Sequence, residues 1–225
     1  MDDYRIGFFI DGFTLKRVNE YYRYYHPYRS RIDFKGLKGW VRAEAVHVFR
    51  PRGNVSMEAH YYHPYKDPKA RGWHTSGILR FEQQIAEAGM QVHYSENYLD
   101  NQLNPNMALV DDAVVFSCYH KINAIVLLST QGQYAILPQR VSRYKIPVLL
   151  LGWDFSYLKN NELVNWKTDN ALKDRASYYV AMEKVVENLT EEDPLRFRIF
   201  QRERALVKSY FRGRAADKVT EWNVS

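Results

Sequence analysis

The sequence of 225 residues contains a single cysteine, Cys118, and no run of eighteen apolar residues. One cysteine excludes a disulfide within the chain and argues against a thiolate metal site. It lies in the apolar run Val114–Tyr119, which predicts a buried, inert thiol. The absence of a long apolar run predicts no membrane span, and Met1–Arg5 lacks the basic and then apolar order of a signal peptide. We therefore expect a cytoplasmic protein.

Acidic residues are fewer than basic ones, so the formal net charge is +6 and the pI is about 9.2. The positive excess gathers near the C-terminus, where the segment 195–214 has one acid, Glu203, and seven basic residues: Arg196, Arg198, Arg202, Arg204, Lys208, Arg212 and Arg214. Such a run suits a nucleic-acid backbone, an acidic protein partner or a solvated helix face. Charge alone does not choose among them.

Aromatic residues are abundant, with eighteen tyrosines. Several follow one another closely and alternate with basic residues: Tyr21, Tyr22, Arg23, Tyr24, Tyr25, His26, Tyr28 and Arg29. Rings in such a pattern are able to stack on unpaired bases. The alternative is a helix that packs some rings into the core and exposes others.

Five short apolar runs have the β-branched and aromatic composition and the flanking turn residues of buried strands. They are Ile6–Ile10, Glu58–Tyr62, Met90–Tyr94, Ala124–Ser129 and Pro147–Leu151. The segment Val46–Val55 is a further strand or a loop, because Pro51 to Asn54 is a strong turn signal.

Helical spacing separates these runs and predicts helices over about Ile78–Ala88, ended by Gly89, and over Ala108–His120 and Tyr134–Tyr144. Alternating strands and helices predict a three-layer α/β/α domain with a mostly parallel, about five-stranded sheet. We place this domain at residues 1–157. Residues 158–225 are predicted to form a helical C-terminal extension with helices Ala171–Asn188 and Pro194–Arg214, the last one basic and packed on the domain.

Ligands of such sheets bind beyond the carboxyl ends of the strands. Asp11 follows the first predicted strand, and Ser129–Gln133 follows the fourth. A basic loop, Pro64–His74, follows the second strand, where Lys66, Lys69 and Arg71 are placed to meet phosphates unless the loop is merely solvated.

Magnesium-dependent hydrolysis of a phosphodiester needs several carboxylates that converge on one or two ions. Strand ends one and four, together with the helix before strand four, are the positions able to supply them. This sequence supplies only part of that set. His60 and His63 lie close in sequence but lack a third nearby ligand, so packing is favoured over zinc binding.

At these positions the sequence resembles the NYN family of PIN-like ribonuclease domains, which includes the LabA-like bacterial proteins. Phe9–Leu15 (Phe-Ile-Asp-Gly-Phe-Thr-Leu) is similar to the family's strand-terminal Asp-Gly-Phe-Asn-Leu, and Val126–Tyr134 is similar to its Ser-Gly-Asp-x-Asp-Phe segment. Asn106–Asp112 falls where the family's Val-Asp and following Asp lie. The resemblance covers about residues 4–155, and the first motif is the more specific.

The resemblance implies a metal site for Mg²⁺ or Mn²⁺ in which Asp11 and Asp112 match acidic, catalytic positions. Three amides replace acids of the family, Asn106, Gln131 and Gln133, and Thr14 stands where the family usually has Asn. A charge pair near 4 Å is worth roughly 4 kcal/mol at an effective dielectric of about 20, so three lost charges weaken a divalent ion's binding severely. Asp111 and Asp154 are weak candidates to compensate.

Each of these residues also has a structural interpretation. Asp11 is able to cap a turn or helix, because Asp-Gly is a turn dipeptide. Asp112 is able to sit exposed in the first turn of a helix. The segment Gln131–Gln133 is able to cap the next helix.

These observations predict an NYN-type domain that binds RNA and has weak or lost metal-dependent ribonuclease activity. A mouth with the hydroxyls of Ser129 and Thr130 and the amides of Gln131, Gln133 and Asn106 would hold an RNA backbone by neutral hydrogen bonds. Further phosphate contacts are expected from basic side chains of the C-terminal helix: Arg198, Arg202, Lys208 and Arg212.

Two alternatives remain open. The first is an active ribonuclease in which Asp11 and Asp112 hold one Mg²⁺ or Mn²⁺ ion. The second is a non-catalytic interaction subunit, in which the C-terminal helices bind a protein partner or a second copy of the chain.

Overall fold

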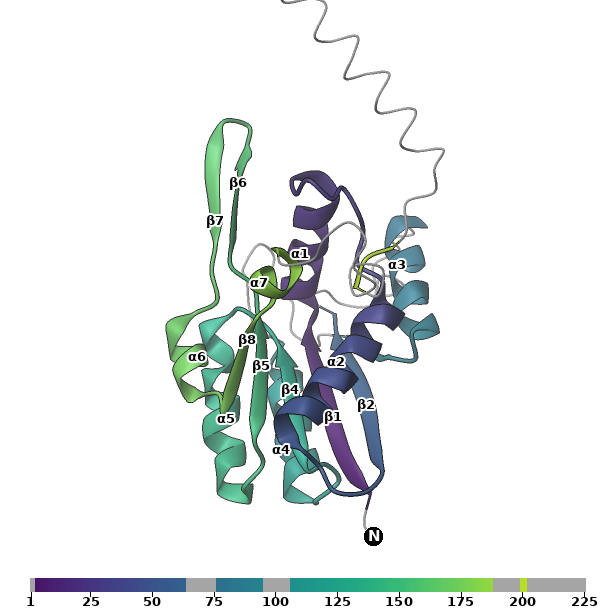
Figure 1. Cartoon of the computed structure of the whole chain (residues 1–225), viewed down its shortest axis with the longest axis vertical. Coiled ribbons are helices and arrows are strands. Elements are labelled where there is room, and N and C mark those ends of the chain that lie inside the picture. Colours follow the sequence, from purple (N-terminus) through teal and green to yellow (C-terminus); the bar gives the residue numbers. More distant parts are fainter. Residues whose placement is uncertain (1–2, 64–75, 95–105, 188–198, 202–225) are drawn as a thin grey trace, which may run out of the picture.

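A parallel sheet of six strands forms the middle layer of the protein (Figure 1). The computed structural model describes residues 3–63, 76–94, 106–187 and 199–201. The strands of the sheet, in the order β3-β2-β1-β4-β5-β8, are β3 (Gln91–His93), β2 (Val55–Tyr62), β1 (Tyr4–Asp11), β4 (Ala124–Leu128), β5 (Val148–Gly152) and β8 (Tyr178–Ala181). All five pairings are parallel. The five predicted strands are confirmed, and β8 adds a sixth.

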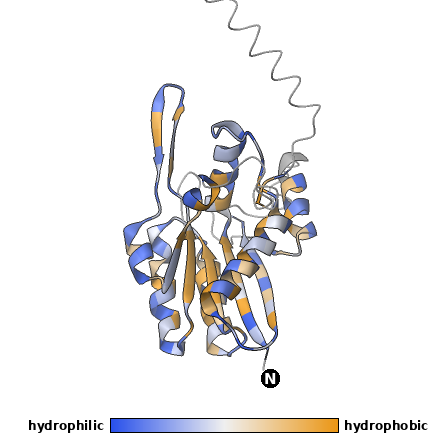
Figure 2. Ribbon diagram, viewed as in Figure 1, coloured by the Kyte–Doolittle hydropathy of each residue, from blue (hydrophilic) through white to orange (hydrophobic). Residues whose placement is uncertain are grey.

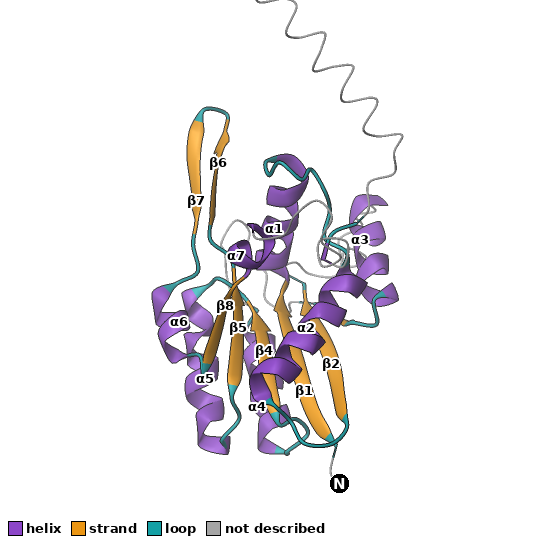
Figure 3. Ribbon diagram, viewed as in Figure 1, coloured by secondary structure: helices purple, strands orange, loops and turns teal. Residues whose placement is uncertain are grey.

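Helices cover both faces of the sheet, which confirms the three-layer α/β/α prediction (Figure 3). One face packs against α1 (Gly12–Tyr24), α2 (Phe34–Phe49), α3 (Ser76–Glu87) and α7 (Met182–Glu187). The other face packs against α4 (Met107–Cys118), α5 (Ile136–Val141) and α6 (Asn170–Arg175). Two short 3₁₀ segments, η2 (Gly132–Ala135) and η3 (Ser142–Tyr144), flank α5.

The central strands β1, β4 and β5 are mostly apolar on both faces because both faces are covered there (Figure 2). In β1, Ile6, Phe8 and Ile10 enter the core on the α1 side, whereas Phe9 enters the core on the α4 side. This alternation follows from the two-residue period of a strand. It also fixes the direction of each side chain at the strand's end.

The strand order reverses at β1, since β2 and β3 extend the sheet to one side and β4 and β5 to the other. A reversal of this kind leaves a crevice beyond the carboxyl ends of the two strands that meet there, and ligands of parallel α/β sheets bind in it. Here the two strands are β1 and β4, paired up to Ile10 and Leu128. Asp11 and Ser129 lie one residue beyond that pair.

The predicted helix Ala171–Asn188 is wrong. Its residues form the short helix α6, the strand β8 and the short helix α7. Tyr178–Ala181 pairs with Leu149–Gly152 along the free side of β5. Hydrogen bonding to an open sheet edge has overridden the helical preference of the flanking Ala, Leu, Lys and Glu residues.

A second departure from the predicted helical extension is an antiparallel hairpin, β6 (Phe155–Lys159) and β7 (Glu162–Trp166), that projects from the carboxyl end of the sheet (Figure 1). Its two turn residues, Asn160 and Asn161, both have positive φ, as the twist of a two-residue hairpin requires. The described part of residues 158–187 thus includes strands, and β8 belongs to the main sheet.

Two smaller predictions also change. Cys118 is exposed, because α4 turns Leu109, Val110, Ala113 and Ser117 inward and leaves Cys118 on its outer side. The predicted strand or loop Val46–Val55 is the end of α2, a turn, and the first residue of β2. Arg50 ends the helix with a left-handed φ of 48°.

Several predictions lie outside the described residues. These are the basic loop residues Lys66, Lys69 and Arg71, the phosphate contacts Arg198, Arg202, Lys208 and Arg212, and the predicted helix Pro194–Arg214 apart from residues 199–201. Within those three residues, Phe200 forms an isolated antiparallel bridge with Ile32, which departs from the helical prediction. Among the helices that the structure describes, none has the length and apolar character needed to cross a membrane.

Candidate functional site

Asp11 is the centre of the crevice at the carboxyl end of β1. Its carboxylate is buried, with 2% of the residue exposed. It is also the N-cap of α1 and accepts hydrogen bonds from the backbone of Phe13 (3.2 Å) and Thr14 (3.3 Å). The capping interpretation of Asp11 is therefore confirmed.

Four further donors surround the same carboxylate, and none of them carries a charge. They are Thr14 Oγ1 at 2.6 Å, Gln131 Nε2 at 3.1 Å, Ser129 Oγ at 3.2 Å and Tyr134 Oη at 3.5 Å. A carboxylate offers about four lone-pair positions in total. Four of the six contacts are made to Oδ2 and two to Oδ1, so both oxygens of the buried carboxylate have donors within the chain.

These contacts determine which hydroxyl group donates and which accepts in each pair. Thr14 has one hydroxyl proton, which is directed at Asp11, so in its 3.2 Å contact with Thr130 the Thr130 hydroxyl donates. The backbone N–H of Thr130 also donates to Thr14 Oγ1, at 3.2 Å. Ser129 Oγ accepts from the backbone N–H of Gln131 at 3.1 Å while donating to Asp11. The loop after β4 is thereby fastened to the start of α1.

Burial raises the pKa of the Asp11 carboxyl above its ordinary value, against hydrogen bonds from Thr14, Phe13 and Ser129 that lower it. Tyr134 is fully buried, and burial together with the nearby charge of Asp11 raises the pKa of its phenol. Tyr134 Oη accepts from the backbone N–H of Asn106 at 2.9 Å and donates to Asp11. It therefore links the Asp11 centre to the start of α4.

Two of the three amides that stand in place of acids donate hydrogen bonds that a carboxylate is unable to make. Gln131 Nε2 donates to Asp11 Oδ2, and Asn106 Nδ2 donates to the carbonyl oxygen of His63 at 3.2 Å. Because both partners only accept, the amide nitrogen must be the group that faces them. Asn106 also caps α4 through its Oδ1, which accepts from Ala108 N at 3.2 Å. Acids at these two positions would face other oxygens.

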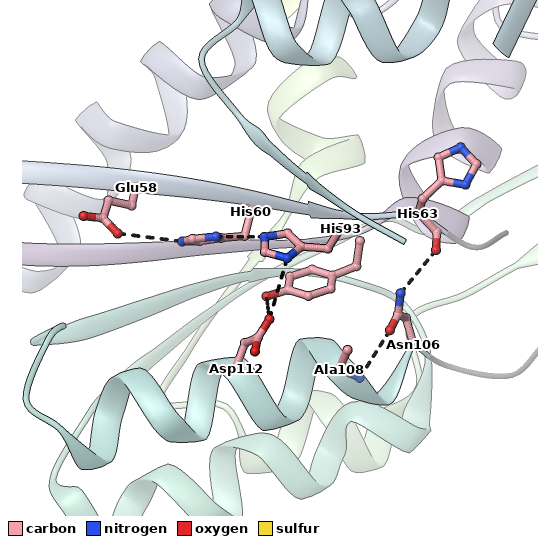
Figure 4. Close-up of polar contacts among 8 residues, drawn as sticks. Glu58, His60, His63, His93, Asn106, Ala108 and Asp112 are labelled. Atoms are coloured by element: carbon pink, nitrogen blue, oxygen red, sulfur yellow. Dashed lines mark hydrogen bonds and ion pairs between the residues drawn. The ribbon is translucent and has the colours of Figure 1, made fainter. Parts of the chain in front are cut away.

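Asp112 belongs to a different polar group, on the α4 side of the sheet (Figure 4). Its Oδ2 accepts from Tyr62 Oη at 2.8 Å and lies 3.8 Å from His93 Nδ1. His93 Nε2 lies 3.2 Å from His60 Nδ1. Burial, and then the neighbouring His93, lower the pKa of His60, which favours its neutral form. Asp112 lies in the middle of α4, not in its first turn.

The metal site implied by the resemblance does not fit this geometry. Asp11 and Asp112 share no hydrogen-bonding partner, and each carboxylate has donors of its own. Within the described ranges, no group of three or more His, Cys, Asp or Glu side chains is able to hold a metal ion. Asp111 is exposed beside Arg140, and Asp154 accepts from Thr168 N and Lys173, so neither compensates.

A pocket of about 490 Å³ opens directly outside the Asp11 centre. Thr130 to Gln133 form one wall, and the residues after β7 form the other. The two walls are joined by the Asp169 N–H, which donates to the Thr130 carbonyl at 3.0 Å. A Cβ on Gly132 would come within 2.6 Å of the Asp169 carboxylate, so this close approach requires glycine.

Aromatic rings run from this pocket along the hairpin. The ring centroids of Phe13 and Trp166 are 5.6 Å apart, and those of Trp166 and Phe155 are 6.3 Å apart. Phe155 stacks on Tyr21 with a centroid distance of 4.2 Å. Trp166 and Lys167 line both this pocket and a neighbouring one of about 570 Å³. The buried Nε1 of Trp166 has no hydrogen-bond acceptor among the described residues.

The structure therefore brings together most of the predicted site: Asp11, Thr14, Ser129, Thr130 and Gln131. Gln133 lines the pocket, Asn106 is linked to Asp11 through the Tyr134 hydroxyl, and Asp112 pairs with Tyr62 instead. Sequence reasoning missed Trp166, Lys167 and Asp169, because they end or follow a hairpin in a segment that was predicted to be helical. The Asn160-Asn161 pair was the signal for that hairpin.

Comparisons with known proteins establish no family for this three-layer α/β/α domain. No family model matches the chain, and no curated protein matches it. A crystal structure of a protein of unknown function from Vibrio parahaemolyticus is similar over 80% of this chain and 93% of that one, with 22% identity and a TM-score of 0.47. A likeness at this level bears on no functional question.

Proposed function

We propose that this protein is an NYN-type, PIN-like domain that binds single-stranded RNA without a metal ion. The observation that carries the proposal is the hydrogen bond from Gln131 Nε2 to Asp11. It places a neutral donor beside the carboxylate at which the resemblance puts a cation. In this proposal the crevice at the strand ends is retained, but it no longer binds a metal ion.

The adjoining pocket has the chemistry that a nucleotide needs. Phe13 and Trp166 offer aromatic surface for a base, and stacking on such rings accepts every base. Gln133 and Asn170 offer amides for base edges, and Lys167 offers a cation for a phosphate. Its volume of about 490 Å³ lies within the range of about 300–1,000 Å³ typical of ligand pockets.

Ribonuclease activity is expected to be weak or lost. Metal-dependent hydrolysis requires carboxylates that converge on the ion, and Asp11 and Asp112 have separate sets of partners. The alternative of an active enzyme predicts Mn²⁺-dependent cleavage that Asp11→Asn abolishes. Cleavage that persists in that variant would come from a contaminating nuclease. The interaction-subunit alternative depends on residues 194–214, which, apart from 199–201, lie outside the described part of the chain.

Fluorescence anisotropy with a labelled oligoribonucleotide of about twelve nucleotides, in EDTA and at low salt, tests the proposal. We expect the wild-type protein to bind and Trp166→Ala to weaken binding about tenfold or more, because one stacked base contributes about 1–3 kcal/mol. The matched control is Tyr119→Ala, which removes a ring that is 72% exposed at the end of α4.

Circular dichroism establishes that both variants fold. Absence of binding by the wild-type protein at low salt, or an equal loss in Trp166→Ala and Tyr119→Ala, would overturn the proposal.

A further inference from the structure

A separate pocket of about 240 Å³ lies between α1, the segment that leads into α2, and α3. Three arginines and two amides supply its polar lining: Arg23, Arg31, Arg80, Asn19 and Gln84. Ile32, Phe34 and Phe81 supply its apolar lining. Among the residues that the structure describes, none with an acidic side chain lines it. At about 30 Å³ for each water of liquid, it has room for roughly eight waters, or for a hydrated oxyanion.

The pocket is held by contacts between distant parts of the chain. Asn19 Oδ1 accepts from Ile32 N at 3.0 Å, which leaves its amide nitrogen as the end able to donate to a ligand. The Arg31 carbonyl accepts from Gln201 N at 2.8 Å. The carbonyl of Arg31 and the N–H of the next residue, Ile32, are thus both held by hydrogen bonds. These bonds fix the backbone at Arg31 without any contribution from its charge.

Acidic side chains on the neighbouring elements are engaged elsewhere. Glu20 pairs with Arg17 at 3.8 Å, Asp33 caps α2 through Gly36 N at 2.8 Å, Glu82 lies 3.4 Å from His63, and Glu87 accepts from Gln83 at 2.8 Å. Arg23 lies over the ring of Tyr24 at 4.6 Å, a contact that leaves its charge in place. Among the described residues, the three arginines have no carboxylate partner.

Bringing three guanidinium groups to one pocket is unfavourable without a counter-charge. Burial, and then the charge of Arg23, lower the pKa of Arg31, with a further contribution from Arg80. An arginine does not relieve such repulsion by losing its proton, as a lysine is able to do. Since no described carboxylate pairs with the three arginines, a bound anion would balance their charge.

We propose that the Arg23–Arg31–Arg80 pocket binds a phosphate group. Guanidinium groups donate pairs of parallel hydrogen bonds and match the oxygens of phosphate in geometry and charge. Three of them, with the amides of Asn19 and Gln84, surround one tetrahedral anion with donors and offer it no competing acceptor charge. The phosphate belongs either to a free phosphorylated ligand or to the backbone of RNA.

This site lies outside the strand-end pocket and does not depend on RNA binding there. The two pockets have no lining residue in common. Each is therefore testable by variants that leave the other intact.

Isothermal titration calorimetry with inorganic pyrophosphate, in chloride buffer of fixed ionic strength, tests the inference. The wild-type protein is expected to bind one pyrophosphate, and Arg80→Gln is expected to weaken binding about tenfold or more, because a charge-assisted pair is lost. Arg80 is an exposed residue of α3, so its replacement leaves the core intact. The matched control is Arg143→Gln, which removes the same charge from the exposed segment η3.

Equal weakening in Arg80→Gln and Arg143→Gln, or no binding by the wild-type protein, would overturn the inference. A competition arm distinguishes the two sources of phosphate. If the oligoribonucleotide displaces pyrophosphate and Arg80→Gln also weakens RNA binding, the pocket takes the RNA backbone. If pyrophosphate binds, Arg80→Gln loses it and RNA affinity is unchanged, the pocket takes a free phosphorylated ligand. In that case the inference stands whether or not Trp166 binds RNA.

Discussion

The Asp11 centre and the Arg23–Arg31–Arg80 pocket both hold charge of one sign. They differ in whether groups of the described chain compensate that charge. Asp11 is one buried negative charge that receives six neutral hydrogen-bond contacts from its own chain. The arginine pocket holds three positive charges and has no carboxylate partner among the described residues. The first site is complete without a ligand, whereas the second lacks a counter-charge.

The difference shows that a buried charge is not by itself a sign of chemistry. Hydrogen bonds from neutral groups are able to satisfy a buried carboxylate, and such a group then serves the structure. The crevice around it keeps its shape and is able to present neighbouring surface, here the pocket of Phe13 and Trp166. Uncompensated charge at a surface pocket instead indicates an external partner.

Asp11→Ala should have the largest effect. It removes the common acceptor and leaves the donors of Thr14, Ser129 and Gln131 without it, which we expect to lower the free energy of unfolding by about 3 kcal/mol or more. Urea unfolding measures the change. Asp111→Ala, on an exposed residue beside Arg140, is the control and should change stability by less than about 0.5 kcal/mol. Similar values for the two variants would contradict a structural role for Asp11.

Gln131→Glu converts the donor beside Asp11 into a second carboxylate of the same size. We expect a loss of about 2 kcal/mol at neutral pH, since one hydrogen bond to a charged group is lost and a repulsion replaces it. Addition of Mn²⁺ should restore part of that stability, measured by thermal unfolding. Gln133→Glu is the matched control in the same loop, where the side chain is exposed. An equal response of both variants to Mn²⁺ would mean that the ion is not held at Asp11.

Asp154 is an intermediate case, a partly buried carboxylate with a cationic partner. Burial alone would raise its pKa, but the hydrogen bonds from Thr168 and Lys173, together with the charge of Lys173, lower it. A lowered pKa in the folded state stabilises the fold at pH values above the unfolded pKa, and the contribution is lost as pH falls through the folded pKa. Asp154→Asn should therefore cost about 1 kcal/mol at pH 7.

The difference between wild type and Asp154→Asn should shrink on acidification below the ordinary Asp pKa of 3.8 and vanish below the folded pKa. Urea unfolding across this pH range follows it. Asp174→Asn, on an exposed residue of α6, is the control. A difference that stays constant with pH would show that the carboxylate charge is not the cause.

Arg80→Gln should have the smallest effect on stability. In chloride buffer, relief of repulsion with Arg31 should leave stability unchanged or raise it by up to about 0.5 kcal/mol. In phosphate the wild-type protein should gain stability and the variant should gain less. Thermal unfolding in the two buffers measures the gain. An equal gain in both proteins would contradict the claim that the arginine pocket lacks a counter-charge that phosphate supplies.

Five strands and the helices α3, α4 and α5 could be predicted because the local signals agreed with the tertiary structure, whereas the bounds of α1 and α2 were not predicted. The five apolar strands have a composition that suits a doubly covered sheet, and Gly89, with φ of 68°, follows α3 as expected. Residues after Trp153 were mispredicted because β8 forms only by pairing with β5. Pairing between residues distant in sequence has no local signature.

That Asp11, Ser129 and Gln131 lie close together was expected from the resemblance and from the rule that ligands bind beyond the carboxyl ends of parallel strands. The sequence did not predict which groups donate and which accept in the hydrogen bonds of the site. Gln131 and Asn106 were predicted as lost acids, and the structure shows them as donors to Asp11 and to the His63 carbonyl. The contacts of Asp112 with Tyr62 and His93 are made by side chains far apart in the sequence, which no spacing rule predicts.

The most direct test of metal-independent RNA binding is the dissociation constant of the labelled oligoribonucleotide measured in EDTA and again in Mn²⁺ at equal ionic strength. Our account predicts values that agree within about a factor of two in wild type, because Asp11 already has its full set of donors. Binding that appears only with Mn²⁺, and is lost in Asp11→Asn, would contradict it.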